Sequence, residues 1–209
     1  MRGKFITIEG QDGAGKSTNI EIITRFLNSK DVEFVTTREP GGTPAGELLR
    51  ETVLNSGSDF IGDDAELLIM FAARAQHLQQ VILPALDKGI WVLSDRFTDA
   101  TYAYQGAGRR CSMEDITTLE TLVQKGLQPD LTLLLDLPVD VGERRAGRRS
   151  EPDRFELQAS EFKTRVRECY LARAKAYSQR MKVVDASQPL ESVQQAVRQT
   201  LEAFWSEHA

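Results

Sequence analysis

Short apolar runs alternate with helix-like stretches along the whole chain. The runs predicted to be strands cover residues 5–9, 33–37, 90–93, 131–136 and 182–185. Four of these five are nearly continuous in hydrophobicity rather than alternating, which is typical of strands covered on both faces of a parallel sheet. Helical periodicity fills residues 16–28, 64–86, 112–125, 138–147, 158–179 and 189–206. The pattern predicts an α/β fold, with a parallel sheet between layers of helices.

Size and charge limit what the protein can do. A chain of 209 residues, 41% of them hydrophobic, is expected to form one domain spanning 1–209. Its net charge of −5 argues against nucleic-acid or anionic-membrane partners, so phosphate binding must be local. The chain has no run of roughly 18 apolar residues and no apolar signal core. Cys111 and Cys169 are far apart in the sequence, so we expect reduced thiols and a cytoplasmic protein.

A glycine-rich loop follows the first predicted strand. It matches G-x-x-x-x-G-K-[ST] and consists of Gly10, Gln11, Asp12, Gly13, Ala14, Gly15, Lys16 and Ser17. Glycines let backbone N–H groups approach a polyphosphate, and the helix beginning near Lys16 adds its dipole. Lys16 is expected to reach the β- and γ-phosphates, and the Ser17 hydroxyl to bind Mg²⁺. The loop predicts nucleotide binding, but GTPases, motor proteins and kinases all share it.

Charged residues also follow the predicted strands, where open α/β sheets bind their ligands. Asp95 comes after an apolar strand and can hold Mg²⁺ directly or through water; a strand-end cap or a surface salt bridge is its alternative. Arg96 offers a fork of donors to phosphate oxygens. Arg38, after the second strand, is a similar candidate, with a solvent-exposed charge as its alternative.

The long helical stretch carries an aromatic and a basic residue on one face. Phe71 and Arg74 are three residues apart, so their side chains are neighbours on a helix. An aromatic ring can stack on a nucleobase, and a guanidinium can donate to a base carbonyl. Taken alone, Phe71 is more simply a core residue and Arg74 a solvated charge.

Arginines are dense near residues 144–156, between two predicted helices. The run contains Arg144, Arg145, Arg148, Arg149 and Arg154, interrupted by Ser150, Glu151 and Pro152. Arginines suit the charge on a transferring phosphoryl group, and a loop that closes excludes water from it. We therefore expect a mobile lid here, with an exposed basic loop as the alternative.

Several further blocks of sequence strongly resemble the bacterial thymidylate kinases, and the resemblance covers nearly the whole chain. The matching blocks read EGQDGAGKST at 9–18 (ending at Thr18), TREPGGT at 37–43, MFAAR at 70–74, DRF at 95–97, TYAYQG at 101–106 and DRFE at 153–156. The first block is common to many NTPases, whereas the second and the pair at 95–106 are far more specific. The resemblance implies a P-loop NTPase fold, a three-layer α/β/α sandwich with a five-stranded parallel sheet.

The resemblance also implies an activity and roles for residues. The reaction would be phosphorylation of dTMP by ATP with Mg²⁺, in a protein that is usually a homodimer with the 64–87 helix as its contact. Asp12 would meet the 3′-hydroxyl of the acceptor sugar, and Arg96 would clamp the acceptor phosphate. The implied base and sugar contacts are Phe71 stacking on thymine, Arg74 donating to its carbonyl, Thr101 near the base, Tyr104 crowding the 2′ position and Gln105 in the same pocket.

The thymidylate kinases place their catalytic arginine either in the phosphate loop or in the lid. Because this phosphate loop offers Gln11 and Asp12 but no arginine, the resemblance implies that the lid supplies it. Arg149 is the first choice for it, with Arg145 and Arg154 next. The acceptor phosphate is already anionic, so no general base is expected. A kinase for another monophosphate, a GTP-dependent switch and an ATP-driven module remain alternatives, although no Asn-Lys-x-Asp guanine-reading motif is present.

Overall fold

The core of the protein is one five-stranded parallel sheet in the order β2-β3-β1-β4-β5. A computed structural model describes residues 2–54, 61–146, 154–155 and 157–208. The strands are β1 (Phe5–Glu9), β2 (Phe34–Arg38), β3 (Trp91–Asp95), β4 (Leu131–Asp136) and β5 (Met181–Asp185). In register, Thr7 of β1 lies beside Ser94 of β3 and Thr132 of β4. The predicted α/β fold with a parallel sheet is confirmed.

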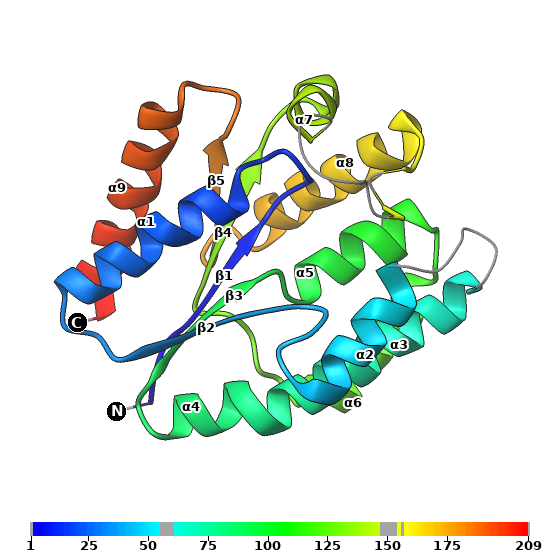
Figure 1. The fold of residues 1–209 in the computed structure, drawn as a ribbon, viewed down its shortest axis with the longest axis horizontal. Helices are drawn as coiled ribbons and strands as arrows, with labels where there is room; N and C mark the ends of the chain where they lie inside the picture. The colour runs from blue at the N-terminus through cyan, green and yellow to red at the C-terminus, as the bar shows by residue number, and fades with distance from the viewer. Residues whose placement is uncertain (1, 55–60, 147–153, 156, 209) are drawn as a thin grey trace.

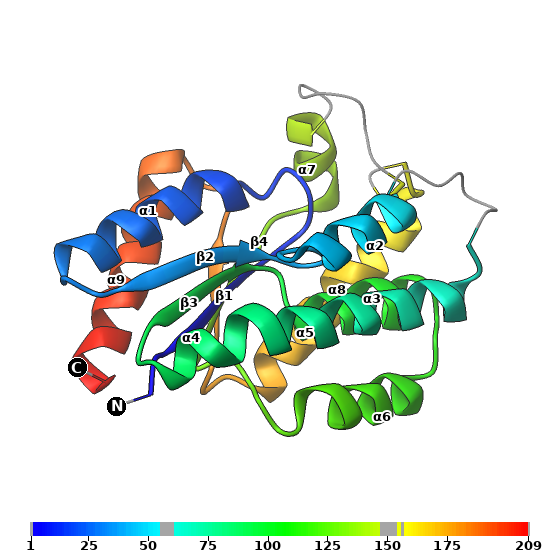
Figure 2. The same ribbon diagram turned by 60° about the horizontal axis from the view of Figure 1, so that its bottom comes forward.

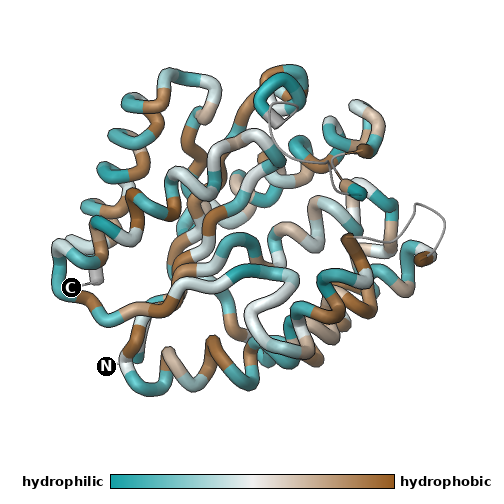
Figure 3. The backbone as a smooth tube through the Cα atoms, viewed as in Figure 1, coloured by the Kyte–Doolittle hydropathy of each residue, from teal (hydrophilic) through white to brown (hydrophobic). Residues whose placement is uncertain are grey.

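Helices cover both faces of this sheet (Figure 1). On one face lie α1 (Lys16–Ser29) and α9 (Leu190–His208), whose apolar residues share a buried cluster with the strands. On the other face lie α4 (Leu83–Asp87), α5 (Thr98–Thr101) and α8 (Ser160–Ala176), as the turned view also shows (Figure 2). Hydrophobic positions are concentrated along the central strands and on the helix faces turned toward them (Figure 3).

The edge strands are less buried than the apolar runs predict. β1 is buried throughout, and β4 is buried up to its last residue, but β2 and β5 each have one neighbouring strand and leave side chains in solvent. Val183 of β5, for example, is 50% exposed. Coverage on both faces is therefore a property of the central strands, and extending it to four strands was wrong.

The predicted 64–86 helix is present but is not regular. It consists of α3 (Asp63–His77), the π-helical segment η1 (Leu78–Ile82) and α4. Pro84, in the first turn of α4, has no N–H to donate, so a regular hydrogen-bond ladder cannot run through this point. The remaining predicted helices correspond to α6 (Met113–Gln124), α7 (Val139–Ala146), α8 and α9.

Two helical segments next to the site were not predicted. One is α2 (Pro44–Leu54), and the other is α5 followed by the π-helical η2 (Tyr102–Gly108). A signal for α2 was available, because Thr43 precedes Pro44 and its hydroxyl accepts from the N–H of Gly46 at 3.0 Å. None of the described helices combines the length and apolar character that crossing a bilayer requires.

Candidate active site

The loop between β1 and α1 has the shape of a phosphate cradle. Gly10, Gly13 and Gly15 have φ of 141°, 80° and 86°. At Gly10 and Gly13 the backbone is also crowded: a Cβ would lie 2.6 Å from the Leu135 carbonyl oxygen and 2.3 Å from that of Gly142. These glycines let the loop pack closely against β4 and α7, next to the N-terminus of α1. The free N–H groups at a helix N-terminus are suited to binding an anion.

The Lys16 side chain is hydrogen-bonded to the backbone of this loop, where a bound anion would lie. Its Nζ donates to the carbonyl oxygens of Gly10 (3.1 Å) and Gln11 (3.4 Å) and lies 3.7 Å from Asp12 Oδ1. Burial, together with the nearby charge of Arg96, lowers the pKa of Lys16 below its ordinary value. A polyphosphate bound here would favour the charged form of Lys16 and raise its pKa again.

Two oxygen groups beside the cradle fit Mg²⁺. Ser17 lies in the first turn of α1 and is exposed to solvent. Asp95 ends β3 directly beside Ile8 of β1, and among the described residues its buried Oδ1 has no hydrogen-bond partner. A buried carboxylate oxygen without a partner is costly unless a cation meets it. Hydroxyl and carboxylate oxygens are the donors that Mg²⁺ prefers, with nucleotide phosphates and water completing its shell.

A cavity lies next to the cradle, under the Glu39–Pro40 loop and between α2, α3 and α5. Its apolar wall consists of Pro40, Leu54, Met70, Phe97, Ala100 and Phe155. Its polar groups are Glu39, Arg50, Arg74, Arg96, Tyr104 and Gln105. An apolar chamber with a few convergent polar groups is the usual form of a site for a small ring-containing ligand.

Arg74 is almost fully buried in the wall of this cavity, at 1% exposure. Its Nε donates to Glu39 Oε2 at 2.7 Å and its Nη2 to Thr101 Oγ1 at 2.9 Å. The guanidinium lies between the rings of Phe71 and Phe97, at 4.8 and 5.2 Å from their centroids. Its Nη1 is buried and, within the described part of the chain, has no partner, which leaves the N–H groups of this nitrogen for a ligand.

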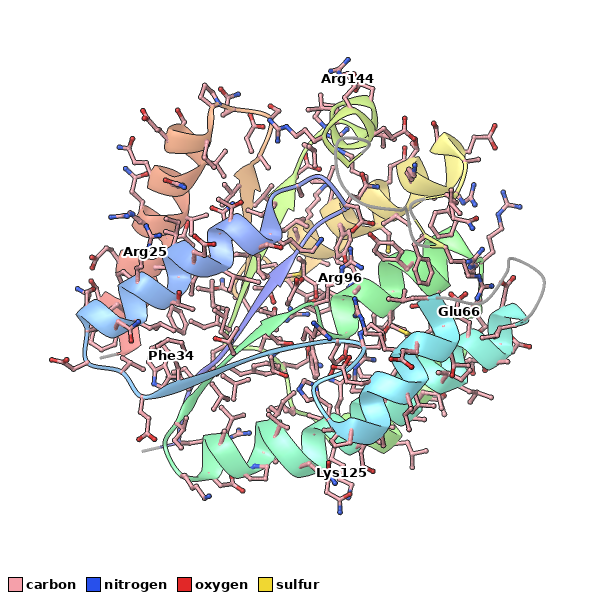
Figure 4. The ribbon with its side chains drawn as sticks, viewed as in Figure 1. Arg25, Phe34, Glu66, Arg96, Lys125 and Arg144 are labelled. Atoms are coloured by element: carbon pink, nitrogen blue, oxygen red, sulfur yellow. The ribbon has the colours of Figure 1, made fainter. Side chains whose placement is uncertain are left out.

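Arg96 joins the cavity to the phosphate cradle. It has a left-handed backbone with φ of 69°, and its Nη2 donates to Asp12 Oδ1 at 2.8 Å and to the Tyr104 hydroxyl at 3.1 Å. The guanidinium also lies 4.9 Å from the centre of the Tyr104 ring. Burial alone would raise the pKa of Asp12, but Arg96 and Lys16 lower it below its usual value, so the carboxylate stays ionised. Figure 4 shows Arg96 near the middle of the molecule.

Comparison with known proteins places the chain in a family. The family model described as thymidylate kinase matches residues 8–197. The thymidylate kinase of Teredinibacter turnerae is 53% identical over 98% of this chain and the whole of that protein. That of Pseudomonas fluorescens SBW25 is 55% identical over 94% of each. The chain belongs to the thymidylate kinase family.

The fold agrees with this membership, and the resemblance seen in the sequence is confirmed. A crystal structure of thymidylate kinase from Ehrlichia chaffeensis matches with a TM-score of 0.77 and 30% identity. The match covers 97% of this chain and 99% of that one. The residues that the thymidylate kinase resemblance singled out can therefore be located in the structure one at a time.

The structure brings six of the residues predicted from thymidylate kinases to one place. They are Asp12, Arg74, Arg96, Thr101, Tyr104 and Gln105. Thr101 is fully buried and accepts from Arg74, so it supports that arginine instead of lining the cavity. Gln105 lines the cavity and donates to Glu66 Oε1 at 2.8 Å.

Phe71 does not lie where the predicted stacking role requires. It is 2% exposed, packs with Leu67, Tyr102 and Ile116, and is absent from the cavity wall. Met70, four residues before Arg74, lines the cavity instead. Positions three and four residues before Arg74 both lie near its face of the helix, so spacing alone could not choose between them. Phe71 supports the guanidinium of Arg74, and Met70 is the better placed of the two to contact a base.

Arg38 also lies away from the cavity. Its side chain is 54% exposed and pairs with Glu47 at 2.8 Å. Arg50, on the unpredicted helix α2, lines the cavity and donates to the Pro40 carbonyl at 2.9 Å. Nothing in the sequence favoured Arg50, because its helix was not recognised.

The predicted lid arginines are only partly described. Arg145 on α7 donates to the Ala186 carbonyl at 2.7 Å, in the loop before α9. Arg154 is 5% exposed and lies 3.1 Å from the buried Glu66 on α3. Arg148, Arg149 and the interrupting Ser150, Glu151 and Pro152 lie outside the described residues. Phe155, which the sequence block contained but which received no role, forms a cavity wall 5.5 Å from the Tyr104 ring.

Proposed function

We propose that the protein transfers the γ-phosphoryl group of ATP to dTMP, giving ADP and dTDP for dTTP synthesis. The observation that carries this proposal is the 2.8 Å contact between Arg96 and Asp12, which joins the phosphate cradle to the neighbouring cavity. A donor triphosphate on the cradle and an acceptor phosphate at Arg96 would then face each other. Membership of the thymidylate kinase family supports dTMP as the acceptor.

Phosphoryl transfer between these groups requires positioning and charge neutralisation. Lys16 and the N–H groups of the loop would hold the β- and γ-phosphates, while Arg96 holds the acceptor phosphate. Magnesium bound through Ser17 and Asp95 would supply further positive charge to the phosphates. The acceptor oxygen needs no general base, since the second pKa of a phosphate monoester is roughly 6.

The acceptor's base and sugar would fill the cavity. Arg74 would donate through Nη1 to a carbonyl of the base, with Met70 and Phe155 against the ring. Asp12 would meet the 3′-hydroxyl, and Tyr104 would crowd the 2′ position. Arg50, which the cavity wall includes, is a second candidate for the acceptor phosphate.

Residues 1–209 would act as one nucleoside monophosphate kinase domain in the cytoplasm. The domain would pair as a homodimer through the 64–87 helix. Leu68 on α3 and Leu48 on α2 support this surface, since they are 56% and 67% exposed. Sedimentation of the purified chain at several concentrations tests the pairing.

Release of ADP from ATP and Mg²⁺, measured with each monophosphate in turn, tests the function. The panel is dTMP, dUMP, dCMP, UMP, CMP, AMP and GMP. We expect strong preference for dTMP. Preference for another monophosphate would support a kinase activity but contradict the base and sugar contacts proposed for Arg74 and Tyr104. ADP release without any acceptor would indicate an ATPase.

Replacing Tyr104 tests the sugar contact. Its ring is 6% exposed and is fixed by Arg96, so it cannot swing away from a 2′-hydroxyl. We expect Tyr104→Ala to raise the use of UMP relative to dUMP by about tenfold, because a steric barrier of about 1–2 kcal/mol is removed. Tyr177→Ala, at a half-exposed tyrosine, is the matched control. An unaltered ratio would remove Tyr104 from sugar selection.

Arg149→Ala tests the predicted lid arginine. An arginine that contacts the negatively charged transferring group is worth about 10³-fold or more in turnover. We expect kcat to fall by at least about 10²-fold with little change in dTMP affinity. The exposed Arg25→Ala, on α1, is the control. Normal turnover in Arg149→Ala would pass the role to another arginine of the segment.

A further inference from the structure

A buried chain of polar contacts leads from Thr37 on β2 to Glu39 and Arg74 in the wall of the cavity. Thr37 Oγ1 lies 2.6 Å from His77 Nε2, His77 Nδ1 lies 2.9 Å from Glu39 Oε1, and Glu39 Oε2 accepts from Arg74 Nε at 2.7 Å. The side chains of Glu39, His77 and Arg74 are 3%, 0% and 1% exposed. Burying so many polar groups is costly unless each has its partner, and here the contacts form one connected set.

The contacts fix the protons of this chain. An ionised carboxylate only accepts, so His77 must carry a hydrogen on Nδ1 to meet Glu39. The Thr37 hydroxyl can donate to Nε2, so both ring nitrogens of His77 have a partner. Glu39 then has one acceptor oxygen for His77 and one for Arg74, and it cannot rotate without breaking both contacts.

Arg74 is left with a defined donor and a balanced charge. Its Nε is taken by Glu39 and one hydrogen of Nη2 by Thr101, while the buried Nη1 has no partner among the described residues. Because the Glu39 carboxylate neutralises the guanidinium, this pair has little net attraction for a phosphate. Its free Nη1 instead suits a neutral acceptor such as a ring carbonyl.

We propose that Glu39, held in place by His77, is a positioning residue that sets the base specificity of the cavity through Arg74. With Arg74 fixed, its Nη1 donates to a base that carries a carbonyl group opposite this nitrogen. A base with an amino group at the same position binds less well, since two donors would face each other. This inference rests on the proposed function and adds a determinant of selectivity that acts through Arg74.

The test compares dTMP with dCMP, in which an amino group replaces the 4-carbonyl group of thymine and the 5-methyl group is absent. Because parent and variant proteins meet the same two substrates, the change in their ratio isolates the effect of the substitution. We expect Glu39→Gln to lower the dTMP-to-dCMP ratio of kcat/KM by about tenfold or more, because a buried charged contact that orients a donor is lost. The loss should appear in KM for dTMP, with kcat within a few-fold of the parent. Glu202→Gln, in a surface pair with Lys30, is the matched acid-to-amide control.

His77 gives a second, independent test. An asparagine side chain can place an N–H near the position of the imidazole Nδ1, whereas a leucine side chain has no donor to place there. We expect His77→Asn to retain most of the parent ratio and His77→Leu to lose it. This pair decides the matter if Glu39→Gln does not fold.

The outcomes distinguish a failure of the proposed function from a failure of the role given to Glu39. If the parent protein does not prefer dTMP to dCMP, the proposed function fails. If the parent prefers dTMP but Glu39→Gln changes both substrates equally, Glu39 is a structural residue and the inference is overturned. Equal ratios in His77→Asn and His77→Leu overturn it as well.

Discussion

Lys16→Met is expected to lower kcat by about a thousandfold while dTMP still binds. Electrostatic groups aimed at the transferring phosphates provide most of the catalysis in phosphoryl transfer, and losing one costs roughly 10²–10³-fold. Lys16 is already in place before a nucleotide binds, since its Nζ is fixed by the Gly10 and Gln11 carbonyls. The acceptor cavity lies on other elements and includes no atom of Lys16.

Steady-state kinetics and dTMP titration by calorimetry measure the two effects separately. Methionine keeps the length of the side chain and removes its charge, so the loop should keep its shape. Lys175→Met, on the exposed side of α8, is the control for the same change elsewhere. If Lys16→Met retained parental turnover, the glycine loop would not be the site of the donor phosphates.

Features encoded by consecutive residues were predictable from the sequence. The phosphate loop is one such feature, because each glycine and Lys16 acts through the backbone of its own segment. The parallel sheet is another, since buried central strands such as β4 need apolar residues on both faces. Asp95 and Arg96 followed from the rule that ligands bind at the carboxyl ends of strands.

Features that depend on packing between distant segments were not predictable. Met70 and Phe71 are hydrophobic neighbours, and only the position of η2 against α3 decides which of them faces the cavity. Arg50 depends on α2 folding over the Pro40 loop. His77 is 38 positions from Glu39, so their contact leaves no local pattern in the sequence.

Glu9 is a further residue whose environment only the fold reveals. It ends β1 immediately before the phosphate loop and is 0% exposed. Its Oε1 accepts from the Phe97 N–H at 2.7 Å and its Oε2 from the Tyr170 hydroxyl at 2.7 Å. Burial, and then the negative charge of Asp99, raise the pKa of Glu9 from 4.5 to about 8. At neutral pH the folded protein therefore holds a proton on this carboxyl group.

Glu9→Gln should consequently remove a large pH dependence of stability. The folded chain keeps the proton up to pH of about 8, whereas the unfolded chain releases it near pH 4.5. Between these values the folded state binds more protons, so the stabilisation present at low pH is lost as the pH rises and the free energy of unfolding falls. A glutamine side chain has the shape of the protonated acid and does not ionise. Its oxygen can accept from the Phe97 N–H and its NH2 group can donate to the Tyr170 hydroxyl oxygen, as the protonated acid would.

We expect the parent to lose about 4 kcal/mol of unfolding free energy relative to Glu9→Gln between about pH 5 and pH 8.5, since each unit of pKa shift corresponds to about 1.4 kcal/mol. Urea unfolding of both proteins across this range measures the difference in unfolding free energy. The contributions of the titratable groups that the two proteins share cancel in this difference. Glu202→Gln again serves as the exposed control and should track the parent. A constant difference between parent and Glu9→Gln would mean that Glu9 is already ionised at the acid end of the range, with the charges of Arg96 and Lys16 outweighing its burial.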